Sequence, residues 1–466
     1  MKNPSRSSGL ALFLALIGVL PSGLRAQDVR NLPPVSRSYA ITKVTVVQSP
    51  GRKLENATVL VRDGVIAAVG QNLSVPADAT IVKGDSLFVY AGFIDGLSRV
   101  AVNKPKEDTN KERQKDPGNP VPEAAGIAPY VDVRGLLNPY EKSIEEWRAL
   151  GFTVGQVVPY GGMLPGNAAL IYYNGEAIDK MVINPKVGLY SELTPAERMY
   201  PATILGVLAK WKELYRQATY AKSFAGVYAA NKAGLEAPAS DRTLEAFYPV
   251  IDKQSPVVFK AEKTLDVQRV LALKAQLGFN VTMVEVKEGW DVIPALKTHA
   301  KVFLSLELPE EKKDEKVKID ADKKKDELAM FPDSVERKAL EKRRDDFTAL
   351  YVGQAAAFQK AGVPFGFSSL SAKPKDARAN LKRMIKAGLS EDAALAALTT
   401  NAAQALGLSD RLGTIDNGKI ANLVISRRPY FDDKSKLMYV FIAGKLFKVD
   451  SPASDKPESD KKKEKP

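Results

Sequence analysis

Between residues 39 and 90, short runs of apolar and polar residues alternate and are separated by turn residues. The run at 40–47 (AITKVTVV) is rich in β-branched side chains, which favour strands. A second run at 58–62 leads into Asp63-Gly64, a pair typical of tight hairpin turns, and the run at 65–70 follows it. The pattern predicts a small antiparallel β-structure at the start of the ordered chain.

From residue 91 to residue 411, strand-length apolar runs alternate with longer helical patterns. The predicted buried strands lie at 91–95, 153–158, 256–261, 281–286, 301–306 and 363–368. Two of the predicted helices end at a glycine, 265–277 before Gly278 and 334–361 before Gly362. Alternation of this length predicts an α/β fold built on a parallel (β/α)8 TIM-like barrel.

The two ends of the chain and one internal run have other patterns. Residues 1–26 combine early positive charges, an apolar run at 10–20 and a small residue at Ala26, which predicts a secretory signal peptide. We therefore expect a periplasmic or secreted protein without a stable membrane anchor, a retained anchor being the alternative. A charged insertion at 309–328 and a polar tail at 450–466, expected to be disordered, complete the predicted organisation.

Composition narrows the chemistry that this chain can carry. It has no cysteine, so disulfides, thiolate metal sites and cysteine nucleophiles are excluded. Its single histidine, His299, lies ahead of a predicted strand, and we expect a surface or packing role for it. The net charge of +13 comes with runs of both signs and no basic stripe carrying aromatics, so nucleic acid is not an expected partner.

Two blocks of sequence resemble the amidohydrolase superfamily. The first is Ala91-Gly92-Phe93-Ile94-Asp95, which is similar to that family's opening Pro-Gly-Phe-Ile-Asp motif, and the second is the stretch 399–425. The resemblance implies a barrel domain at 91–411. It also implies a small composite β-sandwich made from 39–90 and 412–449.

The same resemblance implies a site for a divalent metal, but the ligand residues of the family are missing. Histidines are expected at Leu97 and Arg99 on the first strand, at Lys260 on the fifth and at Val286 on the sixth. An aspartate is expected at Leu370. One histidine in the whole chain cannot form a site with four, so we expect no metal and no other cofactor.

Arg99, Lys260 and Asp95 are the candidate residues at the barrel mouth. One hypothesis is that the two cations replace the charge of the metal and neutralise Asp95. The other is that they bind a small anionic ligand, because a guanidinium fits carboxylate or phosphate groups.

Two functions follow from the resemblance and from the missing ligands. The first choice is a non-catalytic binding or partner protein, with an active amidohydrolase paralogue as a possible partner. The alternative is a hydrolase of carbon–nitrogen bonds, including dipeptide amides, that works through a non-standard site.

Overall fold

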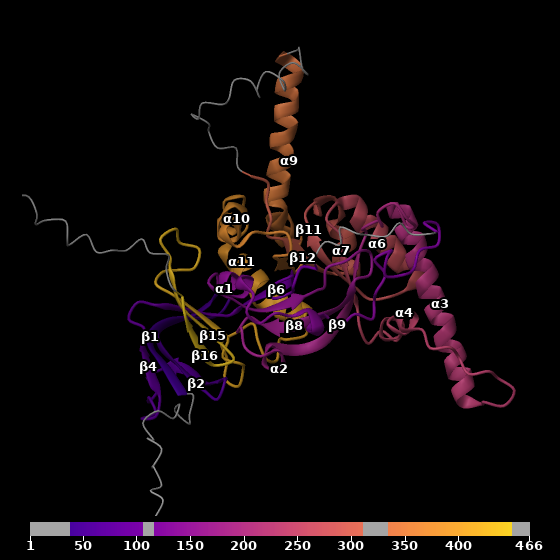
Figure 1. Cartoon of the computed structure of the whole chain (residues 1–466). Coiled ribbons are helices and arrows are strands. Elements are labelled where there is room, and N and C mark those ends of the chain that lie inside the picture. Colours follow the sequence, from indigo (N-terminus) through magenta and orange to yellow (C-terminus); the bar gives the residue numbers. More distant parts are fainter. Residues whose placement is uncertain (1–37, 106–115, 311–333, 450–466) are drawn as a thin grey trace, which may run out of the picture. The chain divides into compact units, whose positions relative to one another are not determined.

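The computed structural model describes residues 38–105, 116–310 and 334–449, and its strands form two eight-stranded sheets (Figure 1). The predicted signal peptide at 1–26 and the tail at 450–466 lie outside the described residues. All but the first two residues of the charged insertion at 309–328 also lie outside them.

The first sheet joins strands from both ends of the chain. Its order is β16-β15-β14-β5-β1-β2-β3, and β4 pairs with β1. The strands are β1 (Ser38–Ser49), β2 (Arg52–Arg62), β3 (Val65–Gln71), β4 (Thr80–Lys83), β5 (Phe88–Ala91), β14 (Leu423–Ser426), β15 (Leu437–Ile442) and β16 (Lys445–Lys448). Figure 1 shows the indigo N-terminal strands beside the yellow C-terminal ones, which is the composite domain that the sequence predicts.

This composite domain is one hydrogen-bonded network rather than two separate sheets. The long strand β1 pairs with β2 along one edge, and with β4 and then β5 along the other. Register shifts at Ile41, Val44 and Val47 bend β1, so that one part of its second edge pairs with β4 and the next part with β5. The buried side chains of this sheet form their own apolar cluster, which includes Val46 and Leu423.

The second sheet is a nearly closed barrel in the order β13-β12-β11-β10-β9-β8-β7-β6. Its strands are β6 (Phe93–Ser98), β7 (Phe152–Val157), β8 (Gly166–Tyr172), β9 (Val182–Glu192), β10 (Val257–Lys260), β11 (Val281–Val286), β12 (Lys301–Ser305) and β13 (Gly366–Ser368). The backbone N–H of Ser369 donates to the carbonyl of Leu97 at 3.0 Å, which brings the first and last strands together. The TIM-like barrel and the composite domain are thus confirmed.

One strand departs from the predicted parallel barrel. β8 runs antiparallel to both β7 and β9. Antiparallel neighbours need only short connections, so no crossover helix separates these three strands. The sole helix between them is the single turn α2 (Ile178–Met181). The glycine-rich stretch at 161–167 leads into β8, but an apolar run does not reveal the direction of a strand.

Helices and short helical turns occupy the remaining connections. The two longest are α3 (Ile204–Ala230) and α9 (Ser334–Lys360). The others are η2 (Val133–Leu136), α1 (Lys142–Arg148), α4 (Arg242–Glu245), α5 (Tyr248–Ile251), α6 (Thr264–Leu277), η3 (Trp290–Val292), α7 (Ile293–His299), α10 (Pro374–Lys386), α11 (Glu391–Leu398) and α12 (Thr400–Ala405). Gly278 and Gly362 have φ of 77° and 64°, the left-handed geometry expected where α6 and α9 end.

An apolar cluster fills the barrel between its strands. Leu97, Val258 and Phe303 are buried members of this cluster. Phe303 lies so close to β6 that a Cβ on Gly96 would be 1.9 Å from its ring. The centre of the barrel is therefore a packed core rather than an open chamber.

Within 38–105, 116–310 and 334–449, no helix has both the length and the apolar character that crossing a bilayer requires.

Candidate functional site

Charged side chains gather where the parallel strands of the barrel end. Because parallel strands present their carboxyl ends at the same edge, residues that follow β6, β9, β10, β11 and β12 lie near one another. Ion pairs connect six of them into a chain, which we call the mouth network: Arg99, Glu192, Lys260, Glu262, Lys287 and Glu307. The network contains three cations and three carboxylates.

Glu192, the last residue of β9, lies at the centre of this network. Its Oε1 accepts from Arg99 Nη2 at 2.7 Å and from the Tyr190 hydroxyl at 2.9 Å. Its Oε2 lies 3.6 Å from Lys260 Nζ and accepts from Thr194 Oγ1 at 3.1 Å. Only 7% of the Glu192 side chain is exposed, so two cations and two hydroxyls satisfy an almost fully buried carboxylate.

Arg99 is held on a second side by an aromatic ring. Its guanidinium carbon lies 4.5 Å from the centroid of the Tyr160 ring, within cation–π range. Its Nε is buried and has no hydrogen-bond partner within the described residues. Arg99 is therefore fixed by one carboxylate and one ring, and its buried Nε–H donor stays unused.

The rest of the network continues from strand to strand. Glu262 Oε1 lies 3.5 Å from Lys260 Nζ and 3.1 Å from Lys287 Nζ, and Lys287 Nζ donates to Glu307 Oε2 at 2.6 Å. Burial alone would raise the pKa of Glu262, but Lys260 and Lys287 outweigh it and hold that pKa below its usual value. Burial would lower the pKa of Lys287, yet Glu307 and Glu262 raise it. Both groups thus stay charged.

Asp95 belongs to a separate, buried cluster. Its Oδ1 accepts from the backbone N–H groups of Leu97 at 3.2 Å and Ser369 at 3.0 Å. Its Oδ2 accepts from the hydroxyls of Ser369 and Tyr173. Burial raises the pKa of Asp95 to about 7, although these hydrogen bonds oppose the rise.

The structure corrects the predicted pairing of Asp95. Arg99 and Lys260 do meet at the barrel mouth, but the carboxylate between them is Glu192. The partners of Asp95 are hydroxyls and amides, not cations. The hypothesis that the two cations neutralise Asp95 is therefore wrong. Arg99 directly follows β6 and Lys260 ends β10, and both side chains pair with Glu192 instead.

Glu285 on β11 is a second buried carboxyl group, and the sequence analysis missed it. It accepts from Ser305 Oγ at 2.6 Å and from the Ser368 hydroxyl. Burial raises its pKa, and the hydrogen bonds from Ser305 and Ser368 oppose the rise. The sequence does carry a signal for this group, because Glu285 is the one acidic residue in the otherwise uncharged strand VTMVEV.

Val286, predicted at the strand-six ligand position, lies elsewhere. It belongs to the large apolar cluster that also holds Phe358 of α9. The register shift between Met283 and Val286, with φ of 61° at Glu285, breaks the regular alternation of this strand. The polar group that this strand contributes to the buried cluster is therefore Glu285.

The other predicted positions are apolar or remote from the mouth network. Leu97 is fully buried in the barrel core, and Leu370 packs against the same cluster. His299 is exposed at the end of α7, ahead of β12, as expected. Neither leucine offers a donor or an acceptor on its side chain.

Both the sequence and the fold of this barrel resemble those of known proteins. Residues 302–447, from β12 to β16, match the family model described as the amidohydrolase family. An amidohydrolase from Thermotoga maritima MSB8 has a TM-score of 0.70 and 21% identity, over 88% of this chain and 100% of that one. Residues 302–447 thus resemble the amidohydrolase family, and the likeness over the rest of the described chain is one of fold.

Other solved structures share the fold. A prolidase complexed with N-methylphosphonate-L-proline has a TM-score of 0.51 and 17% identity, over 88% of this chain and 99% of that one. A Xaa-Pro dipeptidase with bound methionine in its active site has a TM-score of 0.50 and 11% identity, over 88% and 100%. At these identities the likeness concerns the fold. No curated protein sequence matches the chain.

The residues of this chain do not fit the divalent metal that the amidohydrolase resemblance implies. Within the described part, no group of three or more histidine, cysteine, aspartate or glutamate side chains is placed to hold a metal ion. Both oxygens of Glu192 face cations, and both oxygens of Asp95 accept hydrogen bonds from hydroxyls or amides. A divalent ion needs free oxygen or nitrogen donors, and these groups have none to offer.

The chemistry that this arrangement supports is therefore limited. Asp95 and Glu285 have no exposed surface, so neither can contact a substrate in this conformation. Arg99 and Lys260 are partly exposed, but Glu192 already compensates them. The mouth network is suited to holding strand ends together and to limited recognition of charge.

Proposed function

We propose that this chain is a binding or partner protein that has kept the amidohydrolase fold without metal-assisted hydrolysis. The observation that carries the proposal is the ion pairing of Arg99 and Lys260 with Glu192 at family ligand positions. Cations at these positions repel a divalent ion, and Leu97 presents only methyl groups there.

The same contacts favour a structural role for the two cations over a role in binding anions. An anion at Arg99 or Lys260 would have to compete with Glu192, which is nearly buried and fixed by two hydroxyls. The unused Nε of Arg99 is the one feature that favours an added acceptor. If anions bind there, phosphate or acetate will raise the melting temperature of metal-free protein, and Arg99→Lys will reduce the rise.

The decisive experiment combines metal analysis with activity assays. Protein purified without chelator should contain far less than one equivalent of zinc. It should also leave dipeptides, cyclic imides and lactams intact, with or without added zinc. Stoichiometric zinc, together with turnover that chelation removes, would overturn the proposal.

A metal-free hydrolase is the second candidate, and one observation favours it. The pKa of Asp95, raised to about 7 by burial, is suited to a general base near neutral pH. Because Asp95 is sealed from solvent, this candidate requires an opening between β6 and β13. Turnover that survives chelation but is lost in Asp95→Asn would support it, and dipeptides are the first substrates to test because a prolidase and a dipeptidase share the fold.

The location and the partner remain parts of the proposal. The N-terminal pattern at 1–26 supports export, and sequencing the N-terminus of protein recovered from the producing cell will test it. A missing metal site is consistent with a supporting role beside an active paralogue. Co-expression with such a paralogue should change its stability or its KM if this role is correct.

A further inference from the structure

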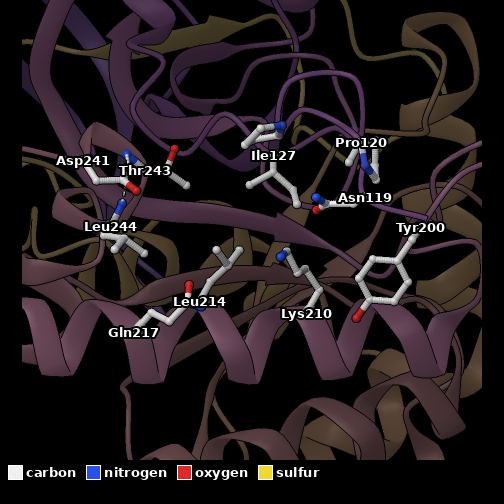
Figure 2. A pocket seen from close by; sticks show the side chains of 12 residues that line it. Asn119, Pro120, Ile127, Tyr200, Lys210, Leu214, Gln217, Asp241, Thr243 and Leu244 are labelled. Carbon is white, nitrogen blue, oxygen red and sulfur yellow. Dashed lines mark hydrogen bonds between the residues drawn. The ribbon is translucent and has the colours of Figure 1, made fainter. Parts of the chain in front are cut away.

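A cavity of about 220 Å³ lies between α3, α4 and the loop at 116–127. We call it the α3 pocket, and Figure 2 shows its lining. None of the mouth-network residues lines it. The volume is below the range of about 300–1,000 Å³ that is usual for drug-sized ligands, so the pocket suits a smaller molecule.

One end of the α3 pocket carries a cation and two unused polar groups. Lys210, Asn119 and Tyr200 lie toward this end in Figure 2. Lys210 Nζ donates to Glu213 Oε1 at 3.0 Å, and 43% of the Glu213 side chain is exposed. The side-chain amide of Asn119 and the hydroxyl of Tyr200 have no hydrogen-bond partner within the described residues. This end can therefore receive an acceptor group such as a carboxylate.

The opposite end of the pocket carries a carboxylate. Asp241 lies there beside Thr243 and Leu244 (Figure 2). Its Oδ1 accepts from the backbone N–H groups of Thr243 at 2.8 Å and Leu244 at 3.2 Å, which caps α4. Its Oδ2 has no partner within the described residues, so it can accept from an ammonium group.

The wall between the two ends is apolar. Ile127 and Leu214 occupy the middle of the view in Figure 2, and both are largely buried. A matching ligand needs a carboxylate at the Lys210 end, an ammonium at the Asp241 end and an apolar body between them. Free amino acids and short peptides with apolar side chains combine these features.

We propose that the α3 pocket binds a zwitterionic amino acid or dipeptide that has an apolar side chain. This inference rests on the proposed function in one respect: it names a class of ligand for the proposed binding protein. Its test measures binding alone and needs neither metal nor turnover.

The test is calorimetric titration of the full chain with leucine and with leucyl-leucine, which separates the two ligand lengths. N-acetyl-leucine lacks the ammonium and leucinamide lacks the carboxylate. Each should bind at least about tenfold more weakly than the matching zwitterion, because each loses one charge-assisted hydrogen bond.

Variants locate the binding site. Lys210→Met and Asp241→Asn should each weaken binding of the zwitterion by about tenfold or more, and asparagine can still cap α4. Lys212→Met on α3 and Asp179→Asn on α2 are matched controls that should leave affinity unchanged, because neither residue lines the pocket. Circular dichroism confirms that each variant is folded.

Two results would overturn the inference. The first is an absence of heat and of any thermal shift with both zwitterions. The second is binding that is unaffected by Lys210→Met and Asp241→Asn, which would place the ligand elsewhere. Zinc-dependent turnover would remove the proposed function while leaving this inference intact, so the two failures are distinguishable.

Discussion

Glu192 shows how one carboxylate can hold two cations together at the mouth of a barrel. Two cations from β6 and β10 converge on it, and hydroxyls from Tyr190 and Thr194 complete its contacts. Removing one member of a buried ion pair leaves the other charge without a partner, which strongly destabilises the folded state. The intact pair itself contributes little net stability.

Replacing Glu192 by glutamine should therefore destabilise the protein by about 3 kcal/mol, because Arg99 and Lys260 would lose their shared counter-charge. Urea unfolding followed by fluorescence measures the loss. Glu307→Gln is the matched control, since the Glu307 side chain is 44% exposed and should contribute less than about 1 kcal/mol. Equal losses in the two variants would contradict this account of the network.

Asp95 should make stability depend on pH in the direction opposite to a salt-bridged acid. Burial raises its folded pKa from 3.8 to about 7, so the folded state holds a proton that the unfolded chain releases. Its contribution to stability is complete below about pH 4 and is lost as pH rises toward 7. Glu285, whose pKa is also raised by burial, acts in the same direction.

Asp95→Asn should flatten the decline of stability between pH 4 and pH 7. The asparagine oxygen can accept from the N–H groups of Leu97 and Ser369, and its amide group mimics the protonated acid. We expect equal stability at pH 4.5 and a more stable variant at pH 8, measured by urea titrations across the range. Parallel curves for the two proteins would count against the raised pKa.

At the scale of elements, β6 shows how packing decides what the barrel can hold. Gly96 leaves room for the Phe303 ring, which a Cβ would meet at 1.9 Å. Gly366 on β13 faces the same ring, with a Cβ distance of 2.4 Å. The aromatic side chain therefore fills the barrel between its first and last strands.

Gly96→Ala should destabilise the protein by at least about 3 kcal/mol, because the added methyl group overlaps Phe303 within a packed core. Adding Phe303→Leu should recover part of the loss in a double-mutant cycle. Gly353→Ala on α9 is the control, since a Cβ there meets nothing within 4 Å and helix propensity favours alanine by about 1 kcal/mol. Thermal melts of the wild type, the two single variants, the double variant and the Gly353→Ala control measure these differences.

Sequence patterns predicted the elements better than their contacts. The ends of α6 and α9 were visible because Gly278 and Gly362 adopt the conformation that stops a helix. The direction of β8 was not visible, since an apolar run carries no mark of parallel or antiparallel pairing. Sheet direction follows from the length of the connections, and only the folded chain defines those.

The candidate site divides in the same way. That Leu97 and Arg99 carry no histidine follows from residue identity alone. The partner of Arg99 could not, since Glu192 lies 93 positions along the chain and ends a different strand. Glu285 was hidden because a register shift places it, rather than Val286, beside Ser305 and Ser368.

At the scale of the whole molecule, Asn422 connects the composite domain with the barrel. Its carbonyl accepts from Gly92 N–H at 2.7 Å, its Oδ1 accepts from Ala443 N–H at 2.7 Å, and its Nδ2 donates to Thr153 Oγ1 at 3.2 Å. Thr153 is on β7 of the barrel, and Ala443 follows β15. The described residues accordingly belong to one compact unit.

We expect Asn422→Ala to cost about 2 kcal/mol, because it removes two hydrogen bonds at a buried junction. Differential scanning calorimetry should still record one transition at a lower temperature. Asn417→Ala, which removes an exposed contact to Val69 N–H, is the control and should cost less. Two separate transitions in either variant would mean that the composite domain and the barrel unfold independently.

The contact between β6 and β13 has a consequence for the way this protein is made. Asp95 and Ser369, which close the barrel, are 274 residues apart. A ribosome that adds about 5–20 residues per second needs roughly 15 to 50 seconds to cover that distance. Throughout this interval the nascent chain presents an open strand edge that could pair with another molecule. The free edge of β6 is thus open to such pairing until the last barrel strand has been translated.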